Sequence, residues 1–429
     1  MQYIYKIAGI LIFLSFLLTL YSYFIDERFL IISGIFAWSS FLILFNSIKN
    51  KTMISILFIL SLMAFLISYF NGFKIDYIKV FTVNQYLLTL LIAVGFLRLI
   101  AKPKKDKLSI LPKGKESFIK TYLGVHLFGS VINLSSLILV ADKMYKKAPL
   151  TNSQIILLTR AFSSDAYWSP FFVAFAAAIT YAPKLNTTLI LLNGIILAFF
   201  AFFITYFEVT RNKEFKIDEF RGYPLTFNSL YLPFILGLLV LVTNYFYQNI
   251  KVIVLISLYS LLMTIFILAL KKGFNQSLKR LNQHIIDELP KMRVEMGLFL
   301  VSGMFGILAG SILIGMDIRL PFEIFDWKVA SLLLLIFIFL AFIGIHPIIT
   351  IAIIGDFFNE VNHTLLALTF LMAWSTTVST SPFSGLNLTI VARYGFEGKE
   401  IFKLNIFYAL KMYLVCVLCL FILSKYLNI

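Results

Sequence analysis

Long apolar stretches separated by short polar loops run through the whole chain. Thirteen such stretches occur, at 4–25, 29–47, 52–71, 80–100, 118–141, 154–182, 187–208, 228–245, 250–270, 296–316, 329–357, 363–393 and 404–425. At about 1.5 Å of rise per residue, each is long enough to form a helix that crosses or deeply enters a bilayer. The pattern therefore predicts an all-α polytopic membrane protein.

Three of these stretches are longer than a single crossing requires. Residues 154–182, 329–357 and 363–393 also carry Pro, Gly, Ser and Thr in mid-course. Such segments are typical of broken helices or re-entrant hairpins. The polar segment 271–295 has apolar residues at helical spacing, which predicts an amphipathic helix on the membrane surface with His284 on its solvated side.

Composition supports a membrane protein and excludes soluble classes. Hydrophobic residues make up 60% of the 429 residues and charged residues only 14%, whereas a soluble domain is nearer half and a quarter. The net charge of +16 is explained by loops that face the cytoplasm, so no nucleic-acid partner is expected. Cys416 and Cys419 lie in an apolar stretch without a second cysteine pair, so neither a metal site nor a cofactor is predicted.

Two segments of the chain resemble each other at an offset of 212 residues. Residues 161–171 read AFSSDAYWSPF and residues 373–383 read AWSTTVSTSPF, with five of eleven positions identical. Upstream, the Gly-Val-His that ends at His126 recurs as the Gly-Ile-His that ends at His346, at an offset of 220. Two matches in the same order indicate an internal repeat.

The distribution of Lys and Arg predicts that the two copies have opposite orientation. If 118–141 is a hairpin that enters from the cytoplasm and 329–357 one that enters from outside, 27 of the 37 basic residues lie inside and eight outside. This arrangement has about 11 transmembrane helices, two opposed re-entrant hairpins and two broken helices, with a cytoplasmic N-terminus and an outer C-terminus. An inverted-topology repeat in the cytoplasmic (inner) membrane is typical of secondary transporters.

The same arrangement divides the chain into an extra helix, two repeats and a linker. The expected parts are an N-terminal helix 1–28; repeat 1 over 29–208, with scaffold helices 29–100, hairpin 118–141, broken helix 154–182 and helix 187–208; a cytoplasmic linker 209–227; and repeat 2 over 228–429, with scaffold helices 228–316, hairpin 329–357, broken helix 363–393 and helix 404–425. The first helix is expected to be retained, because no small-residue cleavage site follows it.

The broken helices are the predicted substrate and ion site. Proline removes a backbone donor, and the freed groups must line protein or a wet cavity because lipid cannot satisfy them. Half-helix N-termini favour an anion, whereas hydroxyl, amide and carbonyl oxygens suit a hard cation. The candidate residues are Ser163, Ser164, Asp165, Ser169 and Pro170 in the first copy, and Ser375, Thr376, Thr377, Ser379, Thr380, Ser381, Pro382, Gly385 and Asn387 in the second.

Alternative roles remain open for several of these residues. Hydroxyl runs in membrane helices also serve packing and bond back to carbonyls. Asp165 is either a functional charge or a structural partner of Arg160, which itself either binds a carboxylate or lies near the inner interface. The two histidines bind an anion, carry a proton or pack helices. The residues expected at the hairpin tips are His126, Ser130, Asn133, Ser135, His346, Pro347 and Thr350.

This layout resembles the ion transporter superfamily, in particular the divalent anion–sodium symporters. The stretch from Ser381 to Asn387, SPFSGLN, is also similar to the Pro-Pro-x-Gly-Leu-Asn region in the large membrane subunit of tripartite ATP-independent periplasmic (TRAP) transporters. The resemblance implies that the hairpins and broken helices move as one domain against a fixed, dimeric scaffold. The symporters carry Ser-Asn-Thr at both hairpin tips, whereas Ser130–Asn133 and His346–Thr350 stand there in this chain.

Taken as a whole, the sequence favours a secondary active transporter of a small, carboxylate-like organic anion, coupled to Na⁺ or H⁺ and working by an elevator mechanism. Its expected partners are the anion, the lipid bilayer and a second copy in a homodimer. The alternative is a TRAP-like large subunit that needs a periplasmic binding protein. An enzyme is not expected, because the H-E-x-x-H and G-x-S-x-G motifs of candidate membrane-embedded enzymes are absent.

Overall fold

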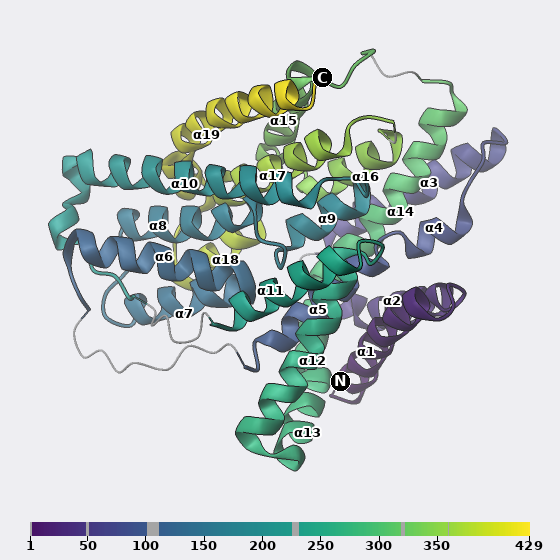
Figure 1. Ribbon diagram of the computed structural model, residues 1–429, viewed down its shortest axis with the longest axis horizontal. Coiled ribbons are helices and arrows are strands. Elements are labelled where there is room, and N and C mark those ends of the chain that lie inside the picture. The colour runs from purple at the N-terminus through teal and green to yellow at the C-terminus, as the bar shows by residue number, and fades with distance from the viewer. Residues whose placement is uncertain (1, 49–50, 101–110, 225–230, 319–321, 359) are drawn as a thin grey trace. The chain divides into compact units, whose positions relative to one another are not determined.

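The computed structural model describes residues 2–48, 51–100, 111–224, 231–318, 322–358 and 360–429. Within these ranges the chain folds into helices joined by short turns, and no β-strand forms (Figure 1). Eight helical segments in the described part of the chain are long and apolar enough to cross a membrane. The prediction of an all-α, multi-pass membrane protein is confirmed.

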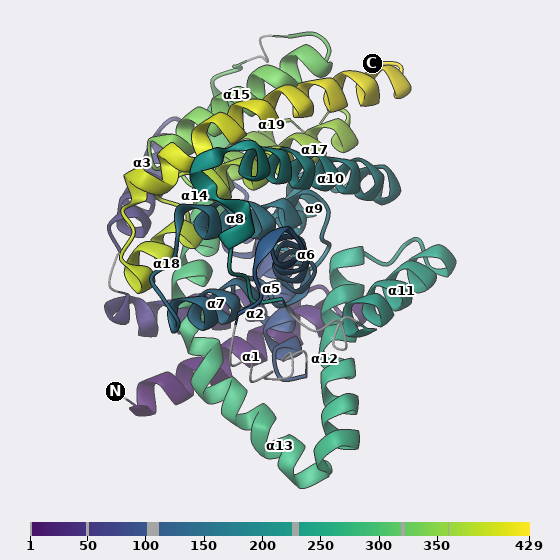
Figure 2. The same ribbon diagram turned by 90° about the vertical axis from the view of Figure 1, so that its left-hand side faces the viewer.

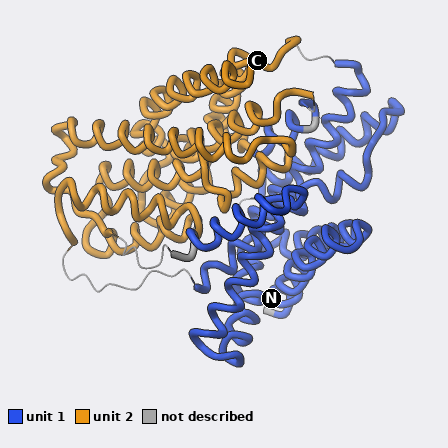
Figure 3. Tube along the Cα trace, in the orientation of Figure 1, with its two compact units in different colours: residues 1–101, 233–321, 348–359 blue, residues 102–232, 322–347, 360–429 orange. Residues whose placement is uncertain are grey.

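The chain divides into two compact units (Figure 3). Unit 1 comprises residues 1–101, 233–321 and 348–359, and unit 2 comprises residues 102–232, 322–347 and 360–429. Unit 1 holds α1 (Gln2–Phe24), α2 (Phe29–Leu44), α3 (Thr52–Phe70), α4 (Tyr77–Thr82), α5 (Gln85–Leu97), α12 (Val252–Lys272), α13 (Phe274–Gln283), α14 (Arg293–Gly315), and most of α11 (Tyr231–Phe246) and α16 (Pro347–Phe357). Unit 2 holds α6 (Gly114–Ile132), α7 (Leu134–Tyr145), α8 (Asn152–Ser163), the 3₁₀ turn η2 (Ser164–Tyr167), α9 (Val173–Tyr181), α10 (Thr187–Arg211), α15 (Trp327–Phe342), α17 (His363–Thr380), α18 (Gly385–Tyr394) and α19 (Gly398–Tyr426).

Unit 1 is a bundle in which α1 packs along α2, α5 along α12 and α3 along α14. Hydrogen bonds link α1, α2 and α5 inside this apolar bundle. Thr19 Oγ1 and Ser33 Oγ are 2.6 Å apart, and Ser33 Oγ lies 3.2 Å from its acceptor, Gln85 Oε1. Because lipid tails are as apolar as the helix surfaces, such hydrogen bonds and close packing hold membrane helices together.

The segment 271–295 is helical, as predicted, but His284 is not solvated. α13 continues through a π-turn, η6 (His284–Glu288), and a 3₁₀ turn, η7 (Leu289–Met292), into α14. His284 is only 5% exposed, and its ring centroid lies 4.7 Å from that of Phe96 in α5. A π-turn holds more residues than an α-turn, so it rotates the side chains that follow it relative to a regular α-helix. The solvated face was predicted from a regular α-helix, so the prediction failed at His284.

Two buried helices, α8 and α17, form the centre of unit 2. Every residue from Ser153 to Ser163 and from His363 to Thr380 is buried. α17 contacts α15, α19, α9 and α10, while α8 contacts α6 and α10, so the other helices of unit 2 surround the central two (Figures 1 and 2). Phe203 on α10 and Phe407 on α19 are among the exposed apolar side chains of these outer helices. The outer helices of unit 2 therefore present the lipid-facing surface.

Side-chain caps begin both central helices. Thr151 and Gln154 form a capping box, in which Thr151 Oγ1 accepts from the Gln154 amide and Gln154 Oε1 accepts from the Thr151 amide. Asn362 Oδ1 accepts from the amides of Thr364 and Leu365 at 3.0 and 3.1 Å. These caps satisfy amides that the first turn of a helix leaves unpaired.

The irregular segments predicted from the sequence are interrupted helices. α8 gives way to η2 and then, past Pro170, to α9, while α17 ends before Pro382 and α18 begins beyond it. The stretch 118–141 consists of α6 and α7, joined at Asn133, whose φ of 52° and ψ of −143° lie outside the left-handed helical region and are rare for residues other than glycine. The stretch 329–357 consists of α15 and α16, joined by the turn 343–346.

Candidate functional site

The two breaks in unit 2 have the same backbone hydrogen bonds at the offset of 212 residues seen in the sequence. Ser169 N donates to Asp165 O at 2.9 Å, and Ser381 N donates to Thr377 O at 2.7 Å. The serine Oγ accepts from the amide two residues later, Phe171 N at 3.2 Å in the first break and Phe383 N at 3.3 Å in the second. The serine carbonyl accepts from the amide three residues later, at 3.1 Å in both breaks. The proline stops the helix, and the serine hydroxyl satisfies one of the amides set free.

Each serine also anchors its break to the preceding helix pair. Ser169 Oγ donates to Ser130 O at 2.5 Å, and Ser381 Oγ donates to Ala341 O at 2.6 Å. The acceptor carbonyls lie in the last turns of α6 and α15, where helix carbonyls lack partners within the helix. The short sequence match therefore reflects a shared local structure.

The two broken helices meet close to their breaks. Ser375 Oγ donates to Ser163 O at 2.7 Å, and Tyr167 OH lies 3.2 Å from Thr376 Oγ1. All four residues are buried. This contact concentrates hydroxyl groups at the centre of unit 2, between the end of α8 and the last half of α17.

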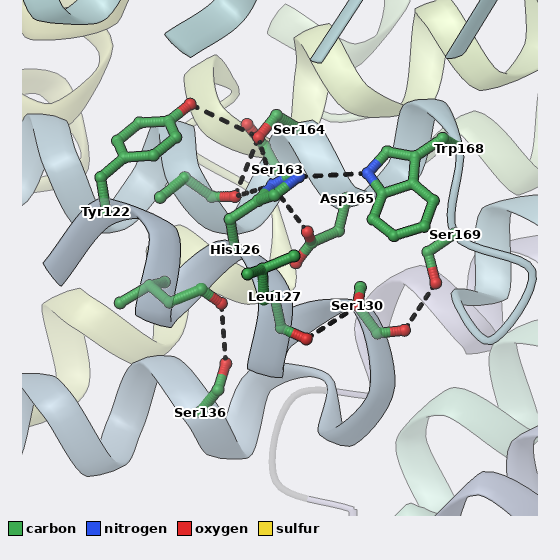
Figure 4. A network of polar contacts seen from close by, with 12 residues as sticks. Tyr122, His126, Leu127, Ser130, Ser136, Ser163, Ser164, Asp165, Trp168 and Ser169 are labelled. Atoms are coloured by element: carbon green, nitrogen blue, oxygen red, sulfur yellow. Dashed lines mark hydrogen bonds and ion pairs between the residues drawn. The ribbon is translucent and has the colours of Figure 1, made fainter. Parts of the chain in front are cut away.

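A buried histidine–aspartate pair lies beside the first break (Figure 4). His126 Nδ1 in α6 is 2.8 Å from Asp165 Oδ1 in η2. Asp165 is fully buried, whereas the His126 side chain retains 11% exposure. His126 Nδ1 is also 2.9 Å from Ser164 Oγ and 3.1 Å from Ala161 O, and Tyr122 OH lies 3.5 Å from the same serine hydroxyl. A carboxylate is strongly disfavoured in apolar surroundings unless it is paired, so His126 is what allows Asp165 to lie there.

Two neighbours fix the position of this pair. Trp168 Nε1 donates to His126 Nε2 at 3.1 Å, so both ring nitrogens of the histidine are engaged (Figure 4). Neither oxygen of Asp165 has a hydrogen-bond partner among the described residues, so His126 contacts the carboxylate at ion-pair distance, and a Cβ atom at Gly129 would clash with Oδ2. Gly129 therefore permits the close approach of the carboxylate to α6.

Arg160 is not the partner of Asp165. Its fully buried guanidinium donates to Asn405 Oδ1 at 2.8 Å, to Glu208 Oε1 at 2.9 Å and to a backbone carbonyl of α19 at 2.8 Å. The ring of Tyr408 stacks against it, 4.4 Å from Cζ. This network ties α8 to α10 and α19, so Arg160 is a structural residue that shares the carboxylate of Glu208 with Lys411.

The side-chain amide of Asn387 lies at the second break, whereas the His126–Asp165 pair lies at the first. Asn387 Nδ2 donates to Ser379 O at 3.1 Å and to Ser381 O at 2.9 Å, while its Oδ1 is buried without a partner in the described part of the chain. A hollow of about 10 Å³, the size of one water molecule, lies between this break and the turn after α15. Its lining includes Gly344, His346, Pro347, Thr377, Ser381 and Ser384.

The remaining hydroxyls of the second copy bond within their own helix. Thr377 Oγ1 donates to Trp374 O at 3.1 Å, and Ser379 Oγ donates to Thr376 O at 3.2 Å. Thr380 Oγ1 lies 3.3 Å from Ser379 Oγ. For Thr377 and Ser379 the structure matches the back-bonding alternative, whereas Thr380 contacts only a neighbouring hydroxyl. Pro382 lies in the break itself and Gly385 is the first residue of α18.

His126 does not lie at the turn between α6 and α7, and its place in the helices differs from that of His346. His126 lies two turns before the end of α6, whereas His346 lies in the turn after α15. Ser169 bonds to Ser130 O and Ser381 bonds to Ala341 O, so Ser130 and Ala341 occupy equivalent positions in the two copies. His126 precedes its equivalent position in the chain, whereas His346 follows it, so the two histidines are not equivalent. A Gly-x-His match is short enough to recur by coincidence in a chain of such low residue diversity.

The other residues expected at the tips lie near them but do not form one site. Ser130 is in the last turn of α6, where its Oγ donates to Leu127 O at 2.9 Å, and Asn133 and Ser135 lie at the turn between α6 and α7. Pro347 begins α16, and Thr350 lies in the part of α16 that belongs to unit 1.

Several residues of the site were missed at the level of sequence. They are Tyr122, Trp168, Glu208, Asn405, Tyr408 and Lys411. One signal could have revealed part of this set, because opposite charges inside membrane segments are expected to pair. Glu208 and Lys411 are two such charges, and Lys411 Nζ is 3.0 Å from Glu208 Oε2.

Comparison with models of known protein families and with curated proteins finds no match. Among the described residues, no group of three or more His, Cys, Asp or Glu side chains could hold a metal ion. The function is therefore argued from the site alone.

Proposed function

We propose that this membrane protein is a secondary active transporter of a small organic anion. The observation that carries the proposal is the meeting of two helices with the same kind of break at the buried centre of unit 2. A break within a membrane segment frees backbone groups that only protein, water or a ligand can satisfy. Transporters place substrate and ion sites at such discontinuities, and a purely structural bundle has no need of two of them.

The set of helices supports the proposal. Eight long segments, the shorter α11 and two broken helices would provide 11 crossings and leave α6–α7 and α15–α16 as re-entrant hairpins. The charge distribution favours opposite orientation of the two copies in this layout. The division into units supports an elevator mechanism, because unit 1 contains the helices expected as scaffold while unit 2 contains both broken helices and the charged pair.

The helix ends at the breaks favour an anionic substrate. α9 and α18 both begin just after a break. Ser384 caps α18 by accepting from the Asn387 amide, whereas Phe172 at the start of α9 provides no side-chain cap for its first amides. Uncapped helix N-termini carry partial positive charge and bind anions. Arg160 is already occupied by Glu208, so a carboxylate would be held by the uncapped start of α9 and by hydroxyl groups near the breaks.

Purified protein in proteoliposomes should accumulate a labelled mono- or dicarboxylate when a Na⁺ or H⁺ gradient is imposed. Ser169→Ala and Ser381→Ala each remove the hydroxyl that holds one break, and each should slow uptake about ten-fold or more, because two hydrogen bonds of about 1 kcal/mol are lost. Ser331→Ala is the matched control, since this hydroxyl only bonds back to its own helix.

Two results would contradict the proposal. One is the absence of accumulation with every carboxylate and both gradients, in protein that circular dichroism shows to be helical. The other is accumulation that appears only when a periplasmic binding protein is added, which would favour the TRAP-like large subunit instead.

A cysteine placed at Glu360 should react with an impermeant maleimide from outside the cell. The opposed arrangement puts this exposed turn residue outside and Lys213, which follows α10, inside, so Lys213→Cys should react only after permeabilisation. The native Cys416 and Cys419 are buried, which keeps background labelling low. If Glu360→Cys also required permeabilisation, the hairpin 329–357 and the inverted repeat would both be wrong.

A further inference from the structure

We propose that His126 Nε2 is the binding site of a coupling proton and that the indole of Trp168 competes with this proton for the nitrogen. The inference rests on the proposed transport function and names its coupling ion. It follows from the hydrogen bonds that surround the imidazole ring in Figure 4.

The indole decides which nitrogen of His126 carries a proton. An indole N–H only donates, so the 3.1 Å contact from Trp168 Nε1 requires an unprotonated Nε2. The neutral ring then carries its proton on Nδ1, which can donate to Ala161 O at 3.1 Å and lies 2.8 Å from Asp165 Oδ1. The structure therefore holds the neutral, Nδ1-protonated form of His126 against the Asp165 carboxylate.

A second proton can bind only at Nε2. Once the lone pair of Nε2 forms an N–H bond, it no longer accepts from Trp168, and the two N–H groups repel each other, so the indole has to leave. The positive charge of the imidazolium is balanced by Asp165 through the Nδ1–H group. The proton comes from water and returns to water, so no further reactant is needed. The 11% exposure of the His126 side chain provides the access.

Release of the indole acts directly on the first break. Trp168 immediately precedes Ser169, and its own amide donates to Asp165 O at 3.2 Å. The next residue holds the break against α6 through the 2.5 Å bond to Ser130 O. Protonation of His126 therefore changes the conformation of the break. A coupled transporter requires such a link between its ion site and its substrate site.

The other titratable groups on the surrounding elements are engaged elsewhere. Tyr122 of α6 contacts Ser164, Arg160 of α8 binds Glu208 of α10, and Asp142 of α7 pairs with Arg393 of α18. Asp218 and Glu219, in the 3₁₀ turn Ile217–Glu219, lie against α6 near its start, where Phe220 packs on Phe118. Asp165 is therefore the group that balances a charged His126.

Nitrogen-15 NMR of the full-length protein with labelled histidine side chains tests the inference without any transport assay. The His126 signals are assigned by their loss in His126→Gln. In the wild type near neutral pH they should show protonated Nδ1 and unprotonated Nε2. Trp168→Phe removes a hydrogen bond that favours the unprotonated form, so the midpoint of the His126 titration should rise by about half to one pH unit. Trp327→Phe, a substitution at the start of α15, should leave it unchanged.

Two results would overturn the inference. One is a wild-type signal with the proton on Nε2, which requires no variant and so remains decisive even if Trp168→Phe does not fold. The other is an unchanged His126 midpoint in a folded Trp168→Phe protein.

Uptake measurements then separate this inference from the proposed function. If the proton couples transport through His126, the pH optimum of uptake should move up in Trp168→Phe together with the NMR midpoint. Transport that is driven by Na⁺ and insensitive to a proton gradient would keep the proposed function and refute the coupling role of His126. Absence of transport in any condition would refute the proposed function, while the NMR result stands by itself.

Discussion

Replacing Asp165 with asparagine should abolish gradient-driven accumulation of the substrate. Asparagine has nearly the same shape as aspartate, and His126 keeps its contact with Ala161 O, so the local structure should survive, but the negative charge is gone. A buried imidazolium without its counter-charge is destabilised by about 3–5 kcal/mol, which lowers the midpoint of His126 protonation by about two to four pH units. His126 would then remain neutral at working pH, and accumulation should fall by about 100-fold or more.

The same substitution at a surface ion pair provides the control. Asp142 and Arg393 are 3.0 Å apart, with side chains that are 37% and 46% exposed, and such pairs contribute about 0–1 kcal/mol. Asp142→Asn should therefore accumulate substrate normally. Uptake by proteoliposomes at several pH values, with circular dichroism to verify helix content, distinguishes the two variants. Wild-type accumulation by Asp165→Asn would show that the charged pair has no part in transport.

Replacing Arg160 with methionine should cause the largest loss of stability of any single substitution considered. Methionine fills similar space, but it leaves Glu208 with Lys411 as its remaining partner and removes the donor of the Asn405 side chain and of a carbonyl of α19. Removing one partner of a buried ion pair costs about 3–5 kcal/mol. We expect a drop of that size in the free energy of unfolding, measured by denaturant titration in detergent.

Two variants calibrate this result. Arg160→Lys keeps the charge but cannot reproduce three directed hydrogen bonds, so its stability should lie between those of the wild type and Arg160→Met. Arg211→Met removes an exposed arginine at the end of α10, whose guanidinium lies 5.1 Å from the Phe207 ring, and should change stability by less than about 1 kcal/mol. Equal losses in Arg160→Met and Arg211→Met would show that the buried network does not hold α8, α10 and α19 together.

The sequence predicted the helices well because membrane helices are specified locally. An apolar run of about 20 residues is both necessary and nearly sufficient for a crossing, since backbone groups in lipid must bond within the segment. The broken helices were also predictable, because Pro170 and Pro382 remove a donor and the serine before each supplies a replacement acceptor. The same local reasoning failed at His284, where a π-turn changes the helical period.

The charged partners were not predictable from position along the chain. Arg160 and Asp165 are close in sequence and of opposite charge, yet each binds a residue from another helix: Arg160 binds Glu208 and Asn405, and Asp165 binds His126. Helical periodicity indicates which face a residue occupies but not which helix packs on that face. Hydroxyls were ambiguous for the same reason, because Ser381 reaches another helix while Ser379 bonds back to its own.

The sequence by itself thus determined that this is an all-α membrane protein with two helices broken at matching Ser-Pro-Phe sites, because chain length, apolarity and proline act through the local backbone. Only the tertiary structure decided that His126, Asp165 and Trp168 form one hydrogen-bonded cluster, that Arg160 is a structural residue, and that α6 to α10 fold with α15 and α17 to α19 into one unit. These outcomes depend on which helices pack together. The apolar residues of a membrane helix can face lipid on every side, so their pattern does not indicate which helix packs against which.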